Sequence, residues 1–213
     1  MKQTAIIYFK LEEQLWEEEN YQSAFSEMPE AIARRIENYT DLMDRQLRIR
    51  GKLLLKEILK DFLLDHSVGL EHIRYSATNR PNLYPDVDFS TAHSGHLVIC
   101  GGLTKGRIGI DTEKIATPEL KAFESFFSPG EWRQINNSDD PVKEFYILWT
   151  RKEALFKATG SGILGNFSEL DVRDTRISLG GTTYYFTRLF IHPDFITHLA
   201  TDLPELTIVL KTI

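Results

Sequence analysis

The sequence lacks features that define several large classes of protein. It contains one cysteine in 213 residues, so a disulfide framework within the chain is excluded. No stretch of about 18 apolar residues is present, so we expect no transmembrane helix. The first residues have the pattern of a strand rather than of a signal peptide. These observations favour a cytoplasmic protein that acts away from the membrane, with Cys100 as a buried, reduced thiol.

Positive charge is also in deficit. The chain has 25 Lys and Arg against 31 Asp and Glu, a formal net charge of −6, which argues against a general nucleic-acid-binding protein. An acidic ligand would need a local basic patch. One predicted helix offers such a patch in Arg45, Arg48, Arg50 and Lys52, with Lys56 one turn further on. A solvated helical face is an equally good interpretation of most of these residues.

Length and composition indicate a folded globular protein. Hydrophobic residues make up 42% and charged residues 26% of the chain, which are ordinary values for such proteins. The chain is long enough for one large domain or two small ones.

Apolar periodicity and turn residues predict helices and strands in a repeating order. We expect helices near residues 14–19, 30–39, 44–64, 118–126, 129–136 and 142–159, and a turn or short helix at 68–72. We expect strands near residues 5–9, 73–75, 88–92, 97–103, 107–113, 169–173, 176–179, 182–190 and 206–211. Lys105-Gly106 and Gly180-Gly181 are predicted hairpin turns. Helices followed by strands, twice over, predict an α+β fold with halves at residues 1–105 and 106–213, although the sequence shows no convincing repeat.

The segment 149–160 places an acid and a base one helical turn apart. Helical geometry puts Glu153 and Lys157 on one side together with Tyr146. The opposite, core-facing side is predicted to hold Phe145, Ile147, Leu148, Ala154, Leu155, Phe156 and Ala158. Gly160 and Gly162 are suited to ending the helix. The alternative is a plain surface pair worth about 0.2–0.5 kcal/mol to the helix.

Two further carboxylates lie in the strand predicted at residues 107–113. Strand alternation turns Asp111 and Glu113 to the same side, within about 7 Å of each other. A hard divalent cation such as Mg²⁺, which prefers oxygen ligands, would remove their mutual repulsion. Glu153 would supply a third carboxylate. The alternative is a strand edge protected by charge.

These segments resemble the 4′-phosphopantetheinyl transferase superfamily, whose signature is Gly-Ile-Asp-x-Glu followed by Trp-x-x-Lys-Glu-Ala-x-x-Lys. Here the two elements are residues 109–113 and 149–157. Residues 126–132, 89–94 and 79–81 are similar to the family's Phe-Phe-Ser-x-x-Glu, Asn-x-Ser-His-Ser and Gly-Lys/Arg-Pro elements, in the same order. The chain departs from the pattern in that Ser90 replaces Asn, Ala92 replaces Ser and Asn79 replaces Gly.

The resemblance implies two pseudo-symmetric α/β halves, each a small, mostly antiparallel sheet packed on helices, with the active site at their junction. The length is similar to that of the two-halved, surfactin-type members, so a monomer is expected. The implied reaction moves the 4′-phosphopantetheine arm of coenzyme A to a serine of an apo acyl or peptidyl carrier protein and releases 3′,5′-ADP.

Roles for individual residues follow from the resemblance and from the chemistry of the side chains. Mg²⁺ would be bound by Asp111, Glu113 and Glu153. Glu153 is the leading general base, directly or through a water, with Glu131 in reserve, and Lys157 would stabilise the pyrophosphate or protonate the leaving side. The expected contacts to the phosphates of coenzyme A are His93, Ser94, Arg80, Lys152 and, for the 3′-phosphate, Arg48.

Two other functions fit parts of the pattern. The carboxylates alone would suit another Mg²⁺-dependent phosphotransferase or pyrophosphatase that acts on a nucleotide. Ser90 and Ala92 would suit a non-catalytic module that binds coenzyme A or a carrier protein without turnover.

Overall fold

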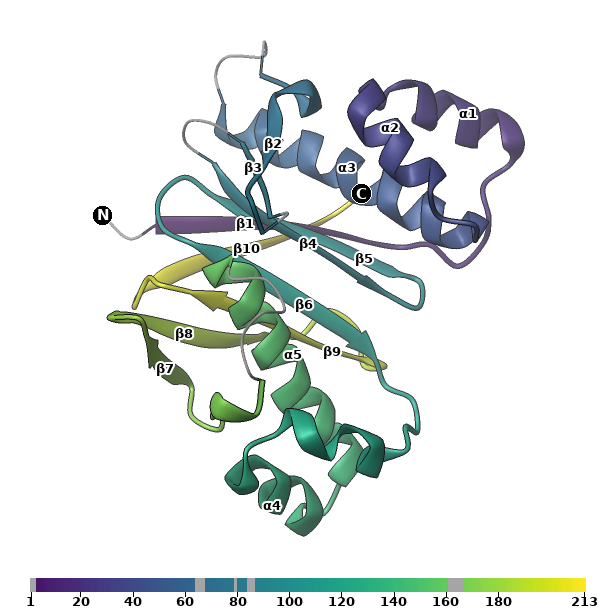
Figure 1. Cartoon of the computed structure of the whole chain (residues 1–213). Helices are drawn as coiled ribbons and strands as arrows, with labels where there is room; N and C mark the ends of the chain where they lie inside the picture. Colours follow the sequence, from purple (N-terminus) through teal and green to yellow (C-terminus); the bar gives the residue numbers. More distant parts are fainter. Residues whose placement is uncertain (1–2, 64–67, 79, 84–86, 161–166) are drawn as a thin grey trace.

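Two four-stranded sheets form the centre of the part of the chain that the structure describes (Figure 1). The structure is a computed structural model, and it describes residues 3–63, 68–78, 80–83, 87–160 and 167–213. Asn79 and Gly162, which the sequence pattern singled out, lie outside those ranges. The fold is α+β, as predicted, with helices packed on the sheets.

The first sheet contains both ends of the described chain. Its strand order is β10 (Leu206–Thr212), β1 (Gln3–Leu11), β5 (Leu97–Leu103) and β4 (Asp88–Ser94). Strands β1 and β10 pair in parallel, whereas the other neighbours are antiparallel. Because β10 completes the first sheet, the chain crosses back over the boundary predicted near residue 105.

The second sheet carries one long helix. Its strand order is β6 (Ile108–Lys114), β9 (Phe195–Thr201), β8 (Thr182–Leu189) and β7 (Arg176–Leu179), all antiparallel. Helix α5 (Pro141–Thr159) lies across β6 and β9. The 3₁₀ helix η2 (Leu120–Phe126), helix α4 (Pro129–Asn137) and a short 3₁₀ helix η4 (Phe167–Glu169) lie beside it (Figure 1).

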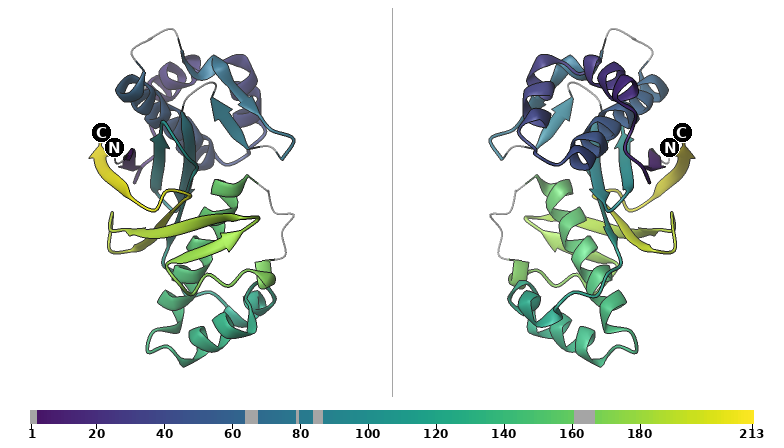
Figure 2. Two further views of the ribbon diagram at one scale, coloured as in Figure 1. Left: turned by 90° about the vertical axis from the view of Figure 1, so that its left-hand side faces the viewer. Right: turned by 90° about the vertical axis from the view of Figure 1, so that its right-hand side faces the viewer.

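Helices α1 (Glu18–Ser26), α2 (Glu30–Glu37) and α3 (Leu42–Phe62) cover the first sheet on its outer side (Figure 2). A 3₁₀ helix η1 (Leu70–His72) and a small two-stranded sheet, β2 (Ile73–Tyr75) with β3 (Pro81–Leu83), connect α3 to β4. Within the described ranges, no helix combines the length and the apolar character needed to cross a bilayer.

Three hydrophobic clusters hold these layers together. One lies between α1–α3 and the first sheet, and a second, rich in aromatic rings, lies between α5 and the second sheet. The third joins the two sheets, because Ile7 and Ile99 of the first pack with Ile108, Ile110 and Leu199 of the second. The two halves therefore share a core, which fixes the helices of one half relative to α5 of the other.

The ends of the two longest helices follow from their sequences. Asp41 and Asp140 each accept a hydrogen bond from an amide in the first turn, of α3 and α5 respectively, which satisfies one of the free N–H groups there. Helix α5 ends at Gly160, whose φ of 69° is the left-handed conformation that glycine adopts without strain.

Several local predictions were wrong. Residues 169–173 form no strand, because their backbone groups bond to side chains instead: Glu131 accepts from the Val172 amide, and Arg151 donates to the Val172 carbonyl. Strands β5 and β6 belong to different sheets, so Lys105-Gly106 is not a hairpin turn. Gly180-Gly181 does connect paired strands, β7 and β8.

Other differences concern helix register and strands that the sequence analysis did not predict. The helix expected at residues 14–19 is α1, and it starts only at Glu18. Strands β3 and β9 were not predicted. Every residue of β9 is buried, so the strand has no alternation of polar and apolar residues to reveal it.

Candidate active site

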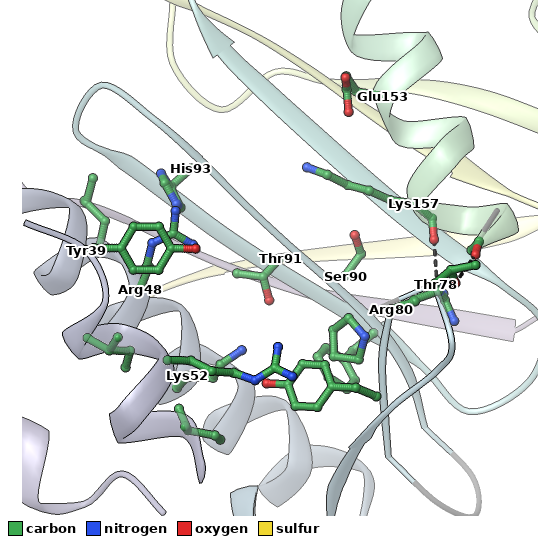
Figure 3. Close-up of a pocket in the computed structure, with 18 of the residues that line it drawn as sticks. Tyr39, Arg48, Lys52, Thr78, Arg80, Ser90, Thr91, His93, Glu153 and Lys157 are labelled. Carbon is green, nitrogen blue, oxygen red and sulfur yellow. Dashed lines mark hydrogen bonds between the residues drawn. The ribbon is translucent and has the colours of Figure 1, made fainter. Parts of the chain in front are cut away.

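A pocket of about 860 Å³ opens between the two halves (Figure 3). Residues of α2, α3 and β4 form its walls, and the last turns of α5 close one end with Glu153 and Lys157. The charged groups lining it are one carboxylate, from Glu153, and the cations of Arg35, Arg48, Lys52, Arg80 and Lys157. The pocket is therefore suited to an anionic ligand.

A close approach of helix and strand brings Lys157 to Asp111. A Cβ atom at Gly109 would lie 2.0 Å from the Ala154 carbonyl oxygen and 2.4 Å from the Ala158 amide nitrogen, so only glycine allows α5 to pack this tightly on β6. Two residues further along β6, Asp111 Oδ1 accepts a hydrogen bond of 2.7 Å from Lys157 Nζ. The Gly-x-Asp spacing thus sets the distance between strand carboxylate and helix lysine.

Asp111 is buried, although a charged side chain on a strand is usually exposed. It is 5% exposed, because α5 covers that face of β6. Burial raises the pKa of Asp111, while its ion pair with Lys157 and a backbone hydrogen bond from Thr112 lower it. Its second oxygen, Oδ2, is buried and has no hydrogen-bond partner in the described structure. An unpartnered carboxylate oxygen is costly in a core.

Glu153 and Glu113 lie close enough to Asp111 for its negative charge to raise the pKa of both. Burial and then the negative charge of Asp111 raise the pKa of Glu153 to about 7, with a further rise from Glu113 and a lowering by Lys157. Burial also raises the pKa of Glu113, against hydrogen bonds from the Ser94 and Trp149 side chains. Three half-buried or buried carboxylates thus repel one another around a single lysine.

The chemistry of these three carboxylates suits a hard cation, but their arrangement in the described structure does not form a metal site. Among the described residues, no three His, Cys, Asp or Glu side chains are arranged to bind a metal ion. The free oxygen of Asp111 and the mutual repulsion of Asp111, Glu113 and Glu153 are what a divalent cation would relieve. The predicted magnesium site therefore stays a prediction, supported by the donor set.

Lys152 and Glu131 form a buried ion pair with each other, which does not agree with the roles predicted for them. Both side chains are 0% exposed, and Lys152 Nζ lies 2.8 Å from Glu131 Oε2. Lys152 also donates to the carbonyls of Phe167 and Leu170, and Glu131 accepts from the amides of Ser128 and Val172. Neither group is exposed to a ligand, so Lys152 is not placed to contact a phosphate and Glu131 is not placed to act as a base.

The predicted phosphate contacts divide into two groups. His93 and Arg48 line the pocket, and the Arg48 guanidinium lies 3.5 Å from the Tyr39 ring centre (Figure 3). Burial and the positive charge of Arg48 lower the pKa of His93, so its imidazole is neutral and can donate from one nitrogen only.

Arg80 and Ser94 have partners within the protein. Arg80 forms a bidentate pair with Asp88, at 2.8 and 2.7 Å, and donates to the Lys157 carbonyl at the end of α5. Although it lines the pocket, its main contacts hold α5 against β4. Ser94 does not line the pocket and donates to Glu113 instead. Ala92 packs between the two sheets, and the cavity wall does not include it.

Sequence analysis missed Arg35 and undervalued Lys52. Of the basic patch on α3, only Arg48 and Lys52 line the pocket, because they are one helical turn apart on the same side. Arg50 and Lys56 pair with Glu12 and Glu27 instead. In the described ranges no carboxylate lies within ion-pair distance of Lys52. The i,i+4 spacing of Arg48 and Lys52 was the available signal.

Comparison with known proteins agrees with this site. A family model described as the 4′-phosphopantetheinyl transferase superfamily matches residues 107–204, which include β6 and α5. The 4′-phosphopantetheinyl transferase gsp of Aneurinibacillus migulanus is 31% identical over 129 residues, 59% of this chain and 53% of that protein. The 4′-phosphopantetheinyl transferase Sfp of Bacillus subtilis strain 168 is 31% identical over 143 residues, 64% of this chain and 63% of that protein.

The chain thus spans between 53% and 63% of the length of these two relatives. Among solved structures, Thermotoga maritima holo-(acyl-carrier-protein) synthase aligns with 45% of this chain and 61% of that chain, at 19% identity and a TM-score of 0.35. The family match covers all four residues of the carboxylate–lysine cluster, Asp111, Glu113, Glu153 and Lys157. Through this region the chain is similar to the 4′-phosphopantetheinyl transferase superfamily.

Proposed function

We propose that the protein transfers the 4′-phosphopantetheine arm of coenzyme A to a serine of an apo acyl or peptidyl carrier protein and releases 3′,5′-ADP. One observation carries this proposal: a cationic pocket between the halves ends at Glu153 and Lys157 (Figure 3), inside the region that matches the family. An anionic donor bound in this pocket would lie beside an acid–base pair.

The pocket suits coenzyme A, which carries a pyrophosphate and a separate phosphate. Its volume of about 860 Å³ is typical of sites for ligands of this size. Burial lowers the pKa of Lys52, and the charges of Arg48 and Arg35 lower it further. A phosphate bound there would supply negative charge next to Lys52, so Lys52, with Arg48 and Arg35 beside it, is the proposed wall for the donor's phosphates.

The proposed chemistry is a substitution at phosphorus. The acceptor serine oxygen attacks the phosphorus atom that bears the pantetheine arm, and the bond from that atom to the bridging oxygen of the pyrophosphate breaks. The serine proton passes to Glu153, and the bridging oxygen leaves as part of 3′,5′-ADP. Lys157, whose side chain is 32% exposed at the pocket end, would balance charge on the departing phosphate.

Asp111, Glu113 and Glu153 are the proposed holders of Mg²⁺. Bound there, the ion would neutralise negative charge that builds on the pyrophosphate oxygens. The residues themselves supply only oxygen ligands, which Mg²⁺ prefers, and Asp111 Oδ2 has no other partner among the described residues.

We also propose that the enzyme is monomeric and that it acts in the cytoplasm. Both walls of the pocket come from one chain, so a second copy is not needed to complete it. Cys100 is buried, and burial raises the pKa of its thiol to about 11, which keeps it protonated and unreactive.

Intact-mass spectrometry tests the proposal directly. The protein is incubated with coenzyme A, Mg²⁺ and an apo carrier protein, with reactions lacking Mg²⁺ or carrying a Ser→Ala carrier as controls. A gain of one phosphopantetheine on the carrier, dependent on the serine, is expected. Nucleotide hydrolysis without that gain would instead indicate a phosphotransferase or pyrophosphatase, and binding of coenzyme A without either product a non-catalytic module.

A further inference from the structure

Strand β4 runs beside β6 without pairing with it through the backbone. The two strands belong to different sheets, yet side chains of β4 accept hydrogen bonds from backbone amides of β6. Asp88 Oδ2 accepts from Ile108 at 2.8 Å, Ser90 Oγ from Ile110 at 2.9 Å and Ser94 Oγ from Lys114 at 3.0 Å. We call these three contacts the β4–β6 seam.

The seam ends at a predicted metal ligand. Besides accepting from the Lys114 amide, Ser94 Oγ lies 2.7 Å from Glu113 Oε2. A serine hydroxyl has one proton to donate. Since the carboxylate can only accept, that proton is directed to Glu113, and it is not available to a phosphate. Ser94 therefore connects a strand of the first sheet to a carboxylate of the second.

The surroundings of Ser94 limit how it can move. A Cβ atom at the next residue, Gly95, would lie 2.9 Å from Lys114 Cδ, so the turn after β4 packs directly against the end of β6. The Trp149 side chain of α5 is also close enough to Glu113 to lower its pKa. The Glu113 carboxylate is thus held by β4 and faces α5.

We infer that Ser94 is a positioning residue that orients Glu113 for binding a divalent cation. This inference rests on the proposed function, because it assigns Glu113 to a metal site. The other two seam contacts have no such connection: Ser90 bonds only to a backbone amide in the seam, and Asp88 pairs with Arg80. The hydroxyl of Ser94 alone joins the seam to the carboxylate cluster.

Ser90 offers a matched control. Ser90→Ala and Ser94→Ala each remove one hydroxyl that accepts a β6 amide, but only Ser94→Ala removes a donor to a carboxylate. Ser94→Thr keeps the hydroxyl. If Ser94 acts through Glu113, its loss weakens metal binding, whereas the loss of Ser90 leaves metal binding unchanged.

The test is a titration of the purified full chain with Mn²⁺, followed by the electron paramagnetic resonance signal of the free ion, without coenzyme A. We expect Ser94→Ala to raise the Kd for Mn²⁺ about tenfold or more, the usual effect of losing a partner of a metal ligand. Ser94→Thr and Ser90→Ala should bind Mn²⁺ as the wild type does. Thermal melting of each variant, measured in parallel, reports any loss of folding.

Each outcome decides the inference. Wild-type affinity in Ser94→Ala, or equal weakening in Ser90→Ala or in Ser94→Thr, would overturn it while leaving the proposed function standing. No Mn²⁺ binding by the wild type would overturn both. As a second readout, Ser94→Ala should need more Mg²⁺ for half-maximal phosphopantetheine transfer yet reach a near wild-type rate at saturating Mg²⁺.

Discussion

Helix α5 contributes two lysines to two carboxylate pairs that differ in their surroundings. In the Lys152–Glu131 pair both side chains are 0% exposed, and further hydrogen bonds to backbone groups satisfy the remaining polar atoms. In the Lys157–Asp111 pair the lysine is 32% exposed, and one aspartate oxygen has no partner in the described structure. The first pair is part of a fully hydrogen-bonded network inside one half of the protein. The second pair lies at a pocket and includes an oxygen without a hydrogen-bond partner in the described structure.

The comparison shows what separates a structural ion pair from a candidate catalytic one. Residue type does not, since both are lysine–carboxylate pairs and both lysines belong to the same sequence motif. The difference lies in how many of the possible hydrogen bonds each pair makes. A buried charge that makes all its hydrogen bonds has no capacity for a ligand. A charge at a cavity that makes only some of them has that capacity.

The largest effect is expected from Glu153→Gln. The amide cannot accept the serine proton, so we expect the transfer rate to fall by about 10²–10⁴-fold, the range for a lost general base. The melting temperature should stay near that of the wild type, because the side chains have the same size. Rates measured by intact mass at saturating Mg²⁺ check this, and an undiminished rate would remove Glu153 from its role.

Lys152→Met should act on stability instead. It leaves the Glu131 charge buried without its partner, which typically costs about 3–5 kcal/mol. Urea unfolding measures the loss. The transfer rate per folded molecule should stay unchanged, and the double variant Lys152→Met with Glu131→Gln should recover part of the stability. A raised KM for coenzyme A in Lys152→Met would instead return Lys152 to the phosphate site.

Lys157→Ala should slow transfer by about 100-fold, comparable to losing one donor to a developing anion. Lys157→Arg should restore part of the rate because it keeps the positive charge. Single-turnover kinetics separate this loss from weaker binding. A wild-type rate in Lys157→Ala would mean that the lysine is only the partner of Asp111, and the two pairs on α5 would then be equivalent.

A last effect, which appears only as the pH falls, concerns a third buried polar contact, between Thr150 of α5 and His198, at 2.7 Å. Burial lowers the pKa of His198 from 6.5 to about 3. Between those values the unfolded chain binds a proton that the folded protein does not. Stability supplied by the neutral imidazole is therefore complete above pH 6.5 and is lost as the pH falls, by about 1.4 kcal/mol per pH unit.

The measurement is the difference in unfolding free energy between the wild type and His198→Gln from pH 7 to pH 4. Buried carboxylates contribute equally to both proteins and cancel in the difference. Parallel curves for the wild type and His198→Gln would show that His198 is not held neutral.

The sequence was sufficient for the strongly patterned elements. Helices α3 and α5 have long apolar periodicity and recognisable caps, and β5 and β6 were placed to within a residue or two. It failed where side chains replace backbone pairing, as at residues 169–173, where Glu131, Arg151 and Lys152 bind the chain. Such contacts depend on residues distant in sequence.

The candidate site shows the same limit. Spacing placed Glu153 and Lys157 on one side of α5 and Asp111 and Glu113 on one side of β6, and one glycine allows α5 to pack closely on β6. Spacing could not show that Lys152 is buried while Lys157 is partly exposed. That difference depends on α4 and on residues 167–170, which contact Lys152. The parallel pairing of β10 with β1 was also not foreseeable from local pattern.

The central claim is that the open carboxylate–lysine cluster of α5 and β6 transfers phosphopantetheine, and one experiment addresses it most directly. Wild type and Glu153→Gln are compared in a single-turnover reaction with coenzyme A, Mg²⁺ and apo carrier protein, followed by intact mass. The account predicts a phosphopantetheine adduct on the carrier serine with the wild type and almost none with Glu153→Gln over the same time. An unmodified carrier with the folded wild type, or equal adduct with both proteins, would contradict it.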